Sequence, residues 1–387
     1  MNRIYLDNSA TTPLCKAARA AMTNAMEHYG NPSSLHESGA DAAARLKNDR
    51  AAVCAALGMR DATAGQLIFT GCGTEANTLA VCGVAAAKPK KGERTVLSTD
   101  SEHPSVENNL RRLEKEGYRV VRLSTRGGEL DLSAAEPYLD SSLFMVTAML
   151  VNNETGARYR VEELFRMAHE KNPRCLCHCD ATQAFLKVPF SFDTLGADLL
   201  TVSAHKIGGP KGVGALALSR AVLSGKSLSP VLFGGGQEGG LRSGTENTVG
   251  IAGFAAAATA GAATFRADVE HMRALSKKLI AGLAGTEIRV NRPPVCAPHI
   301  VSLTMPDIKS ETVLHFLSRA GIAVSSGSAC SSHERHPSAS LLAFGLSPRA
   351  ADTTIRVSFS PQNTEEEVEK LLAALHSGLT DLIRIRH

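Results

Sequence analysis

The sequence predicts an α/β protein with a mostly parallel sheet covered by helices on both faces, followed by a smaller α+β domain. Short apolar, β-rich runs alternate with helical patterns through the middle of the chain, and this alternation is typical of parallel sheets. After an alanine-rich stretch near residues 249–266 the pattern changes. With 387 residues, the chain is long enough for one large domain and a second, smaller one.

Seven runs are expected to form the large sheet, at residues 66–70, 95–98, 118–123, 143–151, 174–179, 199–203 and 214–218. Helical patterns lie between several of them, at residues 75–87, 106–116 and 161–171. Ligands of such sheets bind at the carboxyl ends of the strands, so the loops that follow the strands are where a site is expected.

The pattern changes after an alanine-rich helix at about residues 249–266, and a long helix at about residues 267–284 leads into the second domain. Its strands are predicted at 287–290, 299–304, 323–325 and 355–358, and its helices at 310–320 and from about 364. No Pro/Ser-rich spacer separates the two parts. We therefore place the boundary inside a long helix, with residues 14–260 in the large domain and residues 1–13 and 261–387 in the small one.

Composition excludes several classes of protein. The net charge of +4 is mild, and no Lys/Arg run or aromatic-basic patch indicates nucleic-acid binding. Residues 1–7 lack the apolar segment of a secretory signal, and the apolar runs are too short or too weakly apolar to span a bilayer. Nine cysteines without framework spacing fit a reducing cytoplasm, so we expect a cytoplasmic enzyme without a membrane partner.

The most informative segment is Ser203-Ala204-His205-Lys206, which ends an apolar run and precedes a glycine-rich turn. A partly desolvated lysine amine is more easily deprotonated, and a neutral amine can form a Schiff base with an aldehyde. Asp180, at the end of the preceding strand, is the partner that a pyridinium nitrogen needs. The pair suggests pyridoxal phosphate (PLP), although an ordinary solvated loop would carry the same residue types.

Two glycine-containing segments could bind a phosphate. Gly73 and Thr74 follow a predicted strand at a helix start, where free backbone N–H groups bind anions. The alternative is a helix capped by Thr74 with no ligand. Residues 234–245 form a glycine-dense stretch that ends in Thr245, and it is either a phosphate-approaching loop or a surface connection.

His103 and Asn153 each follow a predicted strand. The His103 ring could stack on a planar cofactor and transfer protons. Asn153 could donate a hydrogen bond to a phenolic oxygen. A solvent-exposed loop histidine and a turn-forming asparagine are the alternatives.

Three cysteines alternate along one predicted strand at Cys175, Cys177 and Cys179. The strand period of two places them on one face, away from His178 and Asp180. Structural zinc ligands usually come from turns with C-x₂₋₄-C spacing, and no second pair is present. The pattern therefore favours packed core thiols, and no metal is expected.

Cys330 and Arg356 are candidates for the reaction itself. Cys330 lies among small residues, where a thiol can be exposed and mobile as a nucleophile requires. Arg356 lies in an apolar strand and needs an anionic partner. That partner is either a substrate carboxylate or an internal ion pair.

In this order, the segments resemble those of cysteine desulfurases, which are class V aminotransferase-like members of the fold-type I PLP enzymes. The resemblance runs from residues 5–13 and 30–36 through every motif above to residues 353–358. The Ser-Ser-Gly-Ser-Ala-Cys segment ending at Cys330 resembles the subgroup that supplies sulfur for iron–sulfur clusters and thiolated tRNA. The resemblance implies a fold-type I large domain with a seven-stranded sheet.

The resemblance also implies roles for individual residues. PLP would be attached to Lys206 and bound through Gly73, Thr74, His103, Asn153, Asp180, Gln183, Ser203, His205 and Thr245. Thr245 would reach the phosphate from the partner subunit of a homodimer. Arg356, with Asn153, would bind the substrate carboxylate, while Lys206 and His103 would transfer protons.

The implied reaction converts L-cysteine to L-alanine and leaves the sulfur on Cys330 as a persulfide, which then passes to an acceptor protein. The alternatives are a selenocysteine lyase, another class V enzyme, or a non-catalytic sulfur- or metal-handling scaffold. Cys72, the cysteine stripe and the charged segment at 331–336 depart from the family pattern.

Overall fold

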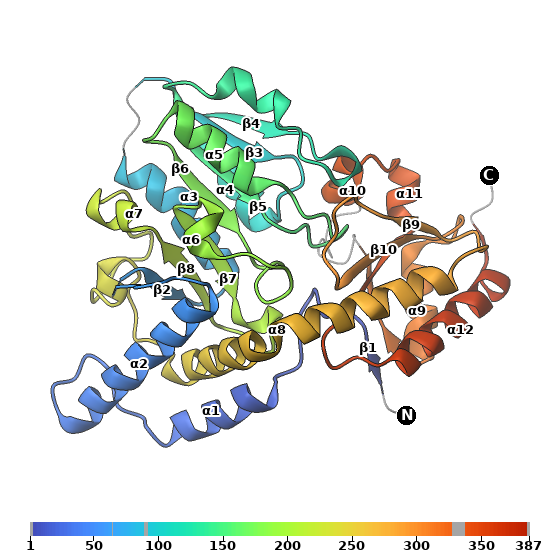
Figure 1. Ribbon diagram of the computed structural model, residues 1–387, viewed down its shortest axis with the longest axis horizontal. Helices are drawn as coiled ribbons and strands as arrows, with labels where there is room; N and C mark the ends of the chain where they lie inside the picture. The colour runs from blue at the N-terminus through green and yellow to red at the C-terminus, as the bar shows by residue number, and fades with distance from the viewer. Residues whose placement is uncertain (1–2, 64, 89–91, 327–336, 385–387) are drawn as a thin grey trace.

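The largest layer of the structure is a sheet with the strand order β2-β8-β7-β6-β5-β3-β4 (Figure 1). The computed structural model describes residues 3–63, 65–88, 92–326 and 337–384. The strands are β2 (Leu67–Thr70), β3 (Thr95–Thr99), β4 (Arg119–Leu123), β5 (Leu143–Met149), β6 (Leu176–Asp180), β7 (Leu199–Ser203) and β8 (Gly214–Leu218). Only β8 runs antiparallel to its neighbours. The predicted seven-stranded, mostly parallel sheet is thus confirmed.

Two apolar cores cover the two faces of this sheet. On one face, α3 (Gly73–Ala87) and α4 (Pro104–Lys115) pack against side chains such as Val96 and Leu199. On the other face, α5 (Val161–Lys171) and α2 (Glu37–Ala56) pack against side chains such as Leu97 and Leu200. Successive side chains along a strand point to opposite faces of the sheet. Because both faces are covered, all of these side chains are buried, and the strand sequences are continuous apolar runs.

A third apolar core, called the small core, lies around a four-stranded antiparallel sheet of order β12-β13-β10-β9. Its strands are β9 (Arg289–Asn291), β10 (Ile300–Thr304), β12 (Ser325–Ser326) and β13 (Thr354–Ser358), and its helices include α9 (Ser310–Arg319) and α12 (Glu365–Asp381). The chain start joins this core, because β1 (Ile4–Tyr5) pairs with β11 (Ile322–Ala323). Short helices complete the fold: α6 (Phe192–Leu195), α7 (Arg220–Ser224), α10 (Ala339–Ala343) and α11 (Pro348–Asp352).

One long helix, α8 (Thr248–Gly282), bridges the two parts, as Figure 1 shows. The sequence analysis divided it into two helices near residue 266, which is wrong: neither proline nor glycine interrupts the chain there. Phe254 and Ala258 pack in the large core, whereas Met272 and Leu279 pack in the small one. We therefore propose the domain boundary near residue 260.

The apolar character of α8 has a packing explanation. The expectation that its apolar run is too weakly apolar to span a bilayer is not met, because by length and composition the helix could cross a membrane. Here it lies along α2 and α1 (Lys16–Met26), a helix for which the sequence analysis made no prediction. Several of its large apolar side chains, including Phe254, Met272 and Leu275, are buried.

Phe254 tests the contribution of α8 to the large core. Its ring is fully buried and contacts the rings of Phe69 and Phe185 edge-on. We expect Phe254→Ala to lower the free energy of unfolding by about 3–5 kcal/mol, because it removes buried area and leaves a cavity. Urea unfolding measures this change. Phe233→Ala, at a ring that is 80% exposed, is the control and should change stability by less than about 0.5 kcal/mol.

Candidate active site

A cavity of about 280 Å³ opens at the carboxyl edge of the large sheet. The parallel register explains its position, since Met149 of β5 pairs with Asp180 of β6, which pairs with Thr201 of β7. The loops after these three strands therefore emerge side by side. The cavity is lined by ten of the residues singled out from the sequence: Gly73, Thr74, His103, Asn153, Asp180, Gln183, Ser203, His205, Lys206 and Arg356.

Of the two other predicted residues, only Thr245 can be placed relative to this cavity. Thr245 is exposed in the loop before α8 and does not line it. Cys330 lies outside the described residues, so its position relative to Lys206 is not part of the geometry below.

Asp180 is a buried carboxylate with two hydrogen-bond donors. Its Oδ2 accepts from Asn77 Nδ2 at 2.8 Å, and its Oδ1 accepts from the backbone N–H of Thr182 at 2.9 Å. The same Asn77 amide nitrogen lies 2.8 Å from Ser105 Oγ. These donors give both oxygens of this buried carboxylate a hydrogen-bond partner at the cavity wall.

Asn77 has a positioning role that the sequence analysis did not assign. It lies one helical turn after Gly73 in α3 and is fully buried. A buried asparagine in an alanine-rich helix is a polar residue that needs a partner. The sequence holds that signal, but it does not show that the partner is Asp180, which is distant along the chain.

His103 is the N-cap of α4 and faces the cavity. Its Nδ1 accepts from the backbone N–H of Ser105 at 3.1 Å, so the ring proton lies on Nε2 when the ring is neutral. Burial lowers the pKa of His103, and nearby Lys206 lowers it further, while Asp180 opposes both effects. The ring is therefore neutral near pH 7 and is not the solvated loop histidine of the alternative interpretation.

Lys206 lies in a short 3₁₀ turn directly after β7. Its Nζ donates to the carbonyl oxygens of Ser9 at 2.6 Å and Ala10 at 2.8 Å. The start of the chain thus holds the lysine in a fixed pose. The neighbouring His205 has its pKa lowered to about 4 by burial and by Lys206, so this ring is also neutral near pH 7.

Hydrogen-bonding capacity is left unused at the end of the cavity next to α3. The N-cap residue of α3, Cys72, makes no side-chain hydrogen bond to the helix. Ser203 Oγ and Gln183 Oε1 are buried without a partner. A Cβ atom on Gly73 would lie at ordinary contact distance, 3.4 Å, from Ser203 Cβ, so Ser203 lies next to the start of α3. An uncapped helix start beside a free hydroxyl is the donor set that a phosphate requires.

Arg356 of β13 reaches the cavity from the small core. Its Nη2 donates to Asp7 Oδ1 at 2.7 Å and its Nη1 to the carbonyl of Asn153 at 2.9 Å. The internal ion pair that the sequence analysis left open is therefore present. Its partner Asp7 was not identified from sequence. The Nε atom of Arg356 remains buried without a partner, beside the cavity.

Gln183 makes a contact within the protein that was not predicted from the sequence. Its amide nitrogen donates to the carbonyl of Ser9 at 2.9 Å rather than pointing only into the cavity. This contact connects the chain start to the loop after β6. The unpartnered Oε1 still belongs to a side chain that lines the cavity.

Together these residues fit PLP. The uncapped α3 start, Ser203 and His205 match a phosphate; Asp180 matches a protonated ring nitrogen; Lys206 matches an aldehyde carbon. The unpartnered Ser203 Oγ is the observation in this structure that points to a missing acceptor. The fold and site define an α/β protein of the PLP-binding kind.

Comparison with known proteins agrees with this class. The aminotransferase class-V family model matches residues 4–371. The chain is 36% identical over 381 residues to the cysteine desulfurase of Trichormus azollae, covering 97% of this chain and 92% of that protein. It is 35% identical to the cysteine desulfurase NifS of Azotobacter vinelandii, covering 96% and 91%. A solved NifS-like protein superposes with a TM-score of 0.91 at 34% identity, covering 98% of this chain and all of that one.

The chain therefore belongs to the aminotransferase class-V family. Its similarity to proteins named cysteine desulfurase extends over nearly its whole length, which confirms the resemblance stated from the motifs.

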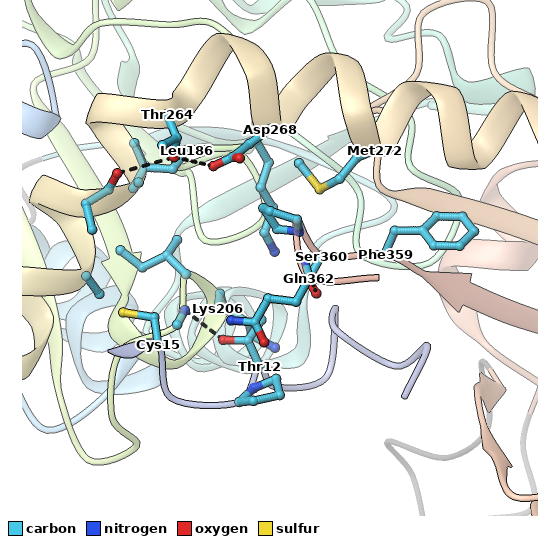
Figure 2. Close-up of a pocket in the computed structure, with 18 residues that line it drawn as sticks. Thr12, Cys15, Leu186, Lys206, Thr264, Asp268, Met272, Phe359, Ser360 and Gln362 are labelled. Atoms are coloured by element: carbon cyan, nitrogen blue, oxygen red, sulfur yellow. Dashed lines mark hydrogen bonds between the residues drawn. The ribbon is translucent and has the colours of Figure 1, made fainter. Parts of the chain in front are cut away.

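A second cavity of about 290 Å³ lies on the other side of Lys206, between α8 and the chain start. Figure 2 shows Lys206 near Cys15 and Thr12 below the α8 residues Thr264, Asp268 and Met272. Lys187 also lines this cavity; it is buried and its Nζ has no hydrogen-bond partner. Burial lowers the pKa of Lys187 to about 7, with smaller contributions from Lys206 and Arg356.

This buried amine predicts a pH-dependent stability. An unfolded lysine titrates near about pH 10, so above pH 7 the unfolded chain binds a proton that the native chain does not. The free energy of unfolding therefore falls as the pH is lowered from about 10 to about 7, and below about 7 the loss is complete. We expect Lys187→Met to raise the melting temperature of the protein, most at or below pH 7 and least near pH 10.

Thermal scans across this pH range, with Lys370→Met at an exposed lysine as the control, measure the effect. A stability gain that does not vary with pH would show that Lys187 does not titrate in this range.

Proposed function

We propose that this protein is a PLP-dependent cysteine desulfurase. It would convert L-cysteine to L-alanine and transfer the sulfur to Cys330 as a persulfide. The observation that carries the proposal is the convergence of Lys206, Asp180 and Arg356 on one cavity, in a chain that is similar over nearly its full length to proteins named cysteine desulfurase.

Each residue has a role that follows from its position. When bound, PLP supplies an electron sink for the negative charge that develops at the substrate α-carbon. The Asp180 carboxylate, held by Asn77 and Thr182, keeps a proton on the ring nitrogen. The backbone N–H groups at Gly73 and Thr74, with Ser203 and His205, bind the phosphate.

Two nitrogen atoms beside the cavity transfer protons, Nζ of Lys206 and Nε2 of His103. Lys206 Nζ, held by the carbonyls of Ser9 and Ala10, removes and returns a proton at the substrate carbon. His103 carries its ring proton on Nε2, because Nδ1 is engaged by Ser105. A neutral imidazole in this pose can both stack on a planar ring and donate that proton.

Sulfur transfer balances without an external oxidant. The Cys330 thiolate attacks the substrate sulfur, an S–S bond forms and the substrate C–S bond breaks. The substrate β-carbon gains a hydrogen, which gives alanine and a Cys330 persulfide. That persulfide then passes to an acceptor protein, a role that the subgroup resemblance connects with iron–sulfur clusters or thiolated tRNA.

We also propose a homodimer in the cytoplasm. Thr245 is exposed and does not line the cavity of its own chain, which suits a contact with the phosphate of a partner subunit. The cysteines of the described residues are free thiols, as a reducing compartment requires.

The central test is turnover of L-cysteine with measurement of alanine and sulfide. We expect Lys206→Ala and Cys330→Ala each to lower sulfide release by at least about 100-fold, because one loses the proton-transferring amine and the other the nucleophile. Cys296→Ala, at an exposed free thiol, is the control and should retain activity. Undiminished turnover of Cys330→Ala would contradict the persulfide route and favour a selenocysteine lyase or another class V reaction.

Substitution of Arg356 is expected to weaken substrate binding, an effect separate from the loss of sulfide release above. Arg356→Lys keeps the positive charge but loses the planar fork that binds a carboxylate in bidentate fashion. We expect the KM for L-cysteine to rise about tenfold or more, with a smaller change in kcat. Steady-state kinetics give both constants. An unchanged KM would show that Arg356 does not bind the substrate carboxylate and acts only in its ion pair with Asp7.

A further inference from the structure

Three side chains with metal-binding atoms meet near the amino end of β6, away from the PLP cavity. They are His169 at the end of α5, Cys177 in β6 and Asp198 just before β7. One nitrogen, one sulfur and one carboxylate oxygen from these residues lie within 4.8 Å of one another. Cys177 is three residues from Asp180 along the strand, a separation of roughly 10 Å.

Cys175 adds a fourth donor. It lies two residues from Cys177 on the same face of the chain, and its thiol is also buried. Its sulfur is not one of the atoms that already lie within 4.8 Å of one another, so its side chain would turn toward them when a metal binds. Two sulfurs, one imidazole nitrogen and one carboxylate oxygen form a four-ligand set that suits tetrahedral zinc.

The ligands are already oriented by neighbouring groups. Asp198 Oδ2 accepts from the backbone N–H of Cys177 at 2.9 Å, and Asp198 Oδ1 accepts from Ser219 Oγ at 3.0 Å. The His169 Nε2 atom faces Asp198 at 3.0 Å, and the ring also has the Cys175 backbone carbonyl as a hydrogen-bond partner. Metal-binding histidines and carboxylates are typically held in this way by a second hydrogen bond.

We propose that His169, Cys175, Cys177 and Asp198 bind one zinc ion. The sequence analysis expected no metal because the stripe alone lacks a second ligand pair. In the fold, the second pair of ligands is His169 of α5 and Asp198, just before β7. Binding displaces the two thiol protons and leaves no open coordination position, so the metal would tie α5 to the sheet rather than act in the reaction.

An access route exists at His169. Its side chain is about one-third exposed, at 33%, whereas both cysteines are buried. A metal ion can therefore enter by displacing the His169–Asp198 hydrogen bond. The proposal is independent of the proposed desulfurase function, because none of its four residues lines the PLP cavity.

The test measures zinc bound to the PLP-loaded protein after equilibrium dialysis against zinc chloride. Cobalt(II) substitution reports the geometry through ligand-field absorption at long visible wavelengths, away from the PLP band. The variants are Cys177→Ser and His169→Ala. The matched control is His28→Ala, which removes a half-buried histidine paired with Asp41 at 3.2 Å. Far-ultraviolet circular dichroism checks that each variant is folded.

We expect about one zinc per chain in the wild type, tetrahedral cobalt absorption, and a rise in melting temperature on adding zinc. In Cys177→Ser and His169→Ala the zinc affinity should fall at least about tenfold, while His28→Ala should match the wild type. Absence of stoichiometric zinc in the wild type, or equal zinc retention in folded His169→Ala, would overturn the proposal. Cysteine turnover is measured on the same samples, so that a failure of the zinc proposal can be distinguished from a failure of the proposed desulfurase function.

Discussion

The buried carboxylate of Asp180 is the constraint around which the site is built. A carboxylate removed from water is stable only with donors and positive charge nearby. Asn77 and the Thr182 backbone supply the donors, and Lys206, in the turn after β7, lines the same cavity. The parallel pairing of β5, β6 and β7 brings these groups to one edge. The chain start completes the arrangement, because the Ser9 carbonyl accepts from both Lys206 and Gln183.

The two parts of the molecule meet at this site through a few polar contacts. Arg356 comes from the small antiparallel sheet, yet it pairs with Asp7 of the chain start and with the carbonyl of Asn153 after β5. A movement of the small core relative to the large sheet would therefore move the arginine relative to Lys206. The position of the small core therefore sets the position of the Arg356 side chain at the cavity.

Much of the fold and the site could be predicted from sequence because local signals agreed. Each strand of the large sheet is an apolar run bounded by turn residues, and the loops after those strands hold His103, Asn153, Asp180 and Lys206. Long-range pairing could not be predicted. Nothing local in the sequence connects Asn77 with Asp180, Asp7 with Arg356, or His169 with Cys177. The two-helix interpretation of α8 failed because the alanine-rich half and the charged half differ in composition but not in conformation.

The identity of the cofactor-bearing lysine is the claim that can be measured most directly. Lys206 and Lys187 line the same second cavity, and both amines are buried or partly buried near the sheet edge. Borohydride reduction of the PLP-loaded protein fixes the cofactor to its lysine, and peptide mapping by mass spectrometry locates it. The geometry predicts the pyridoxyl label on Lys206 alone. A label on Lys187, or no lysine label at all, would contradict this account.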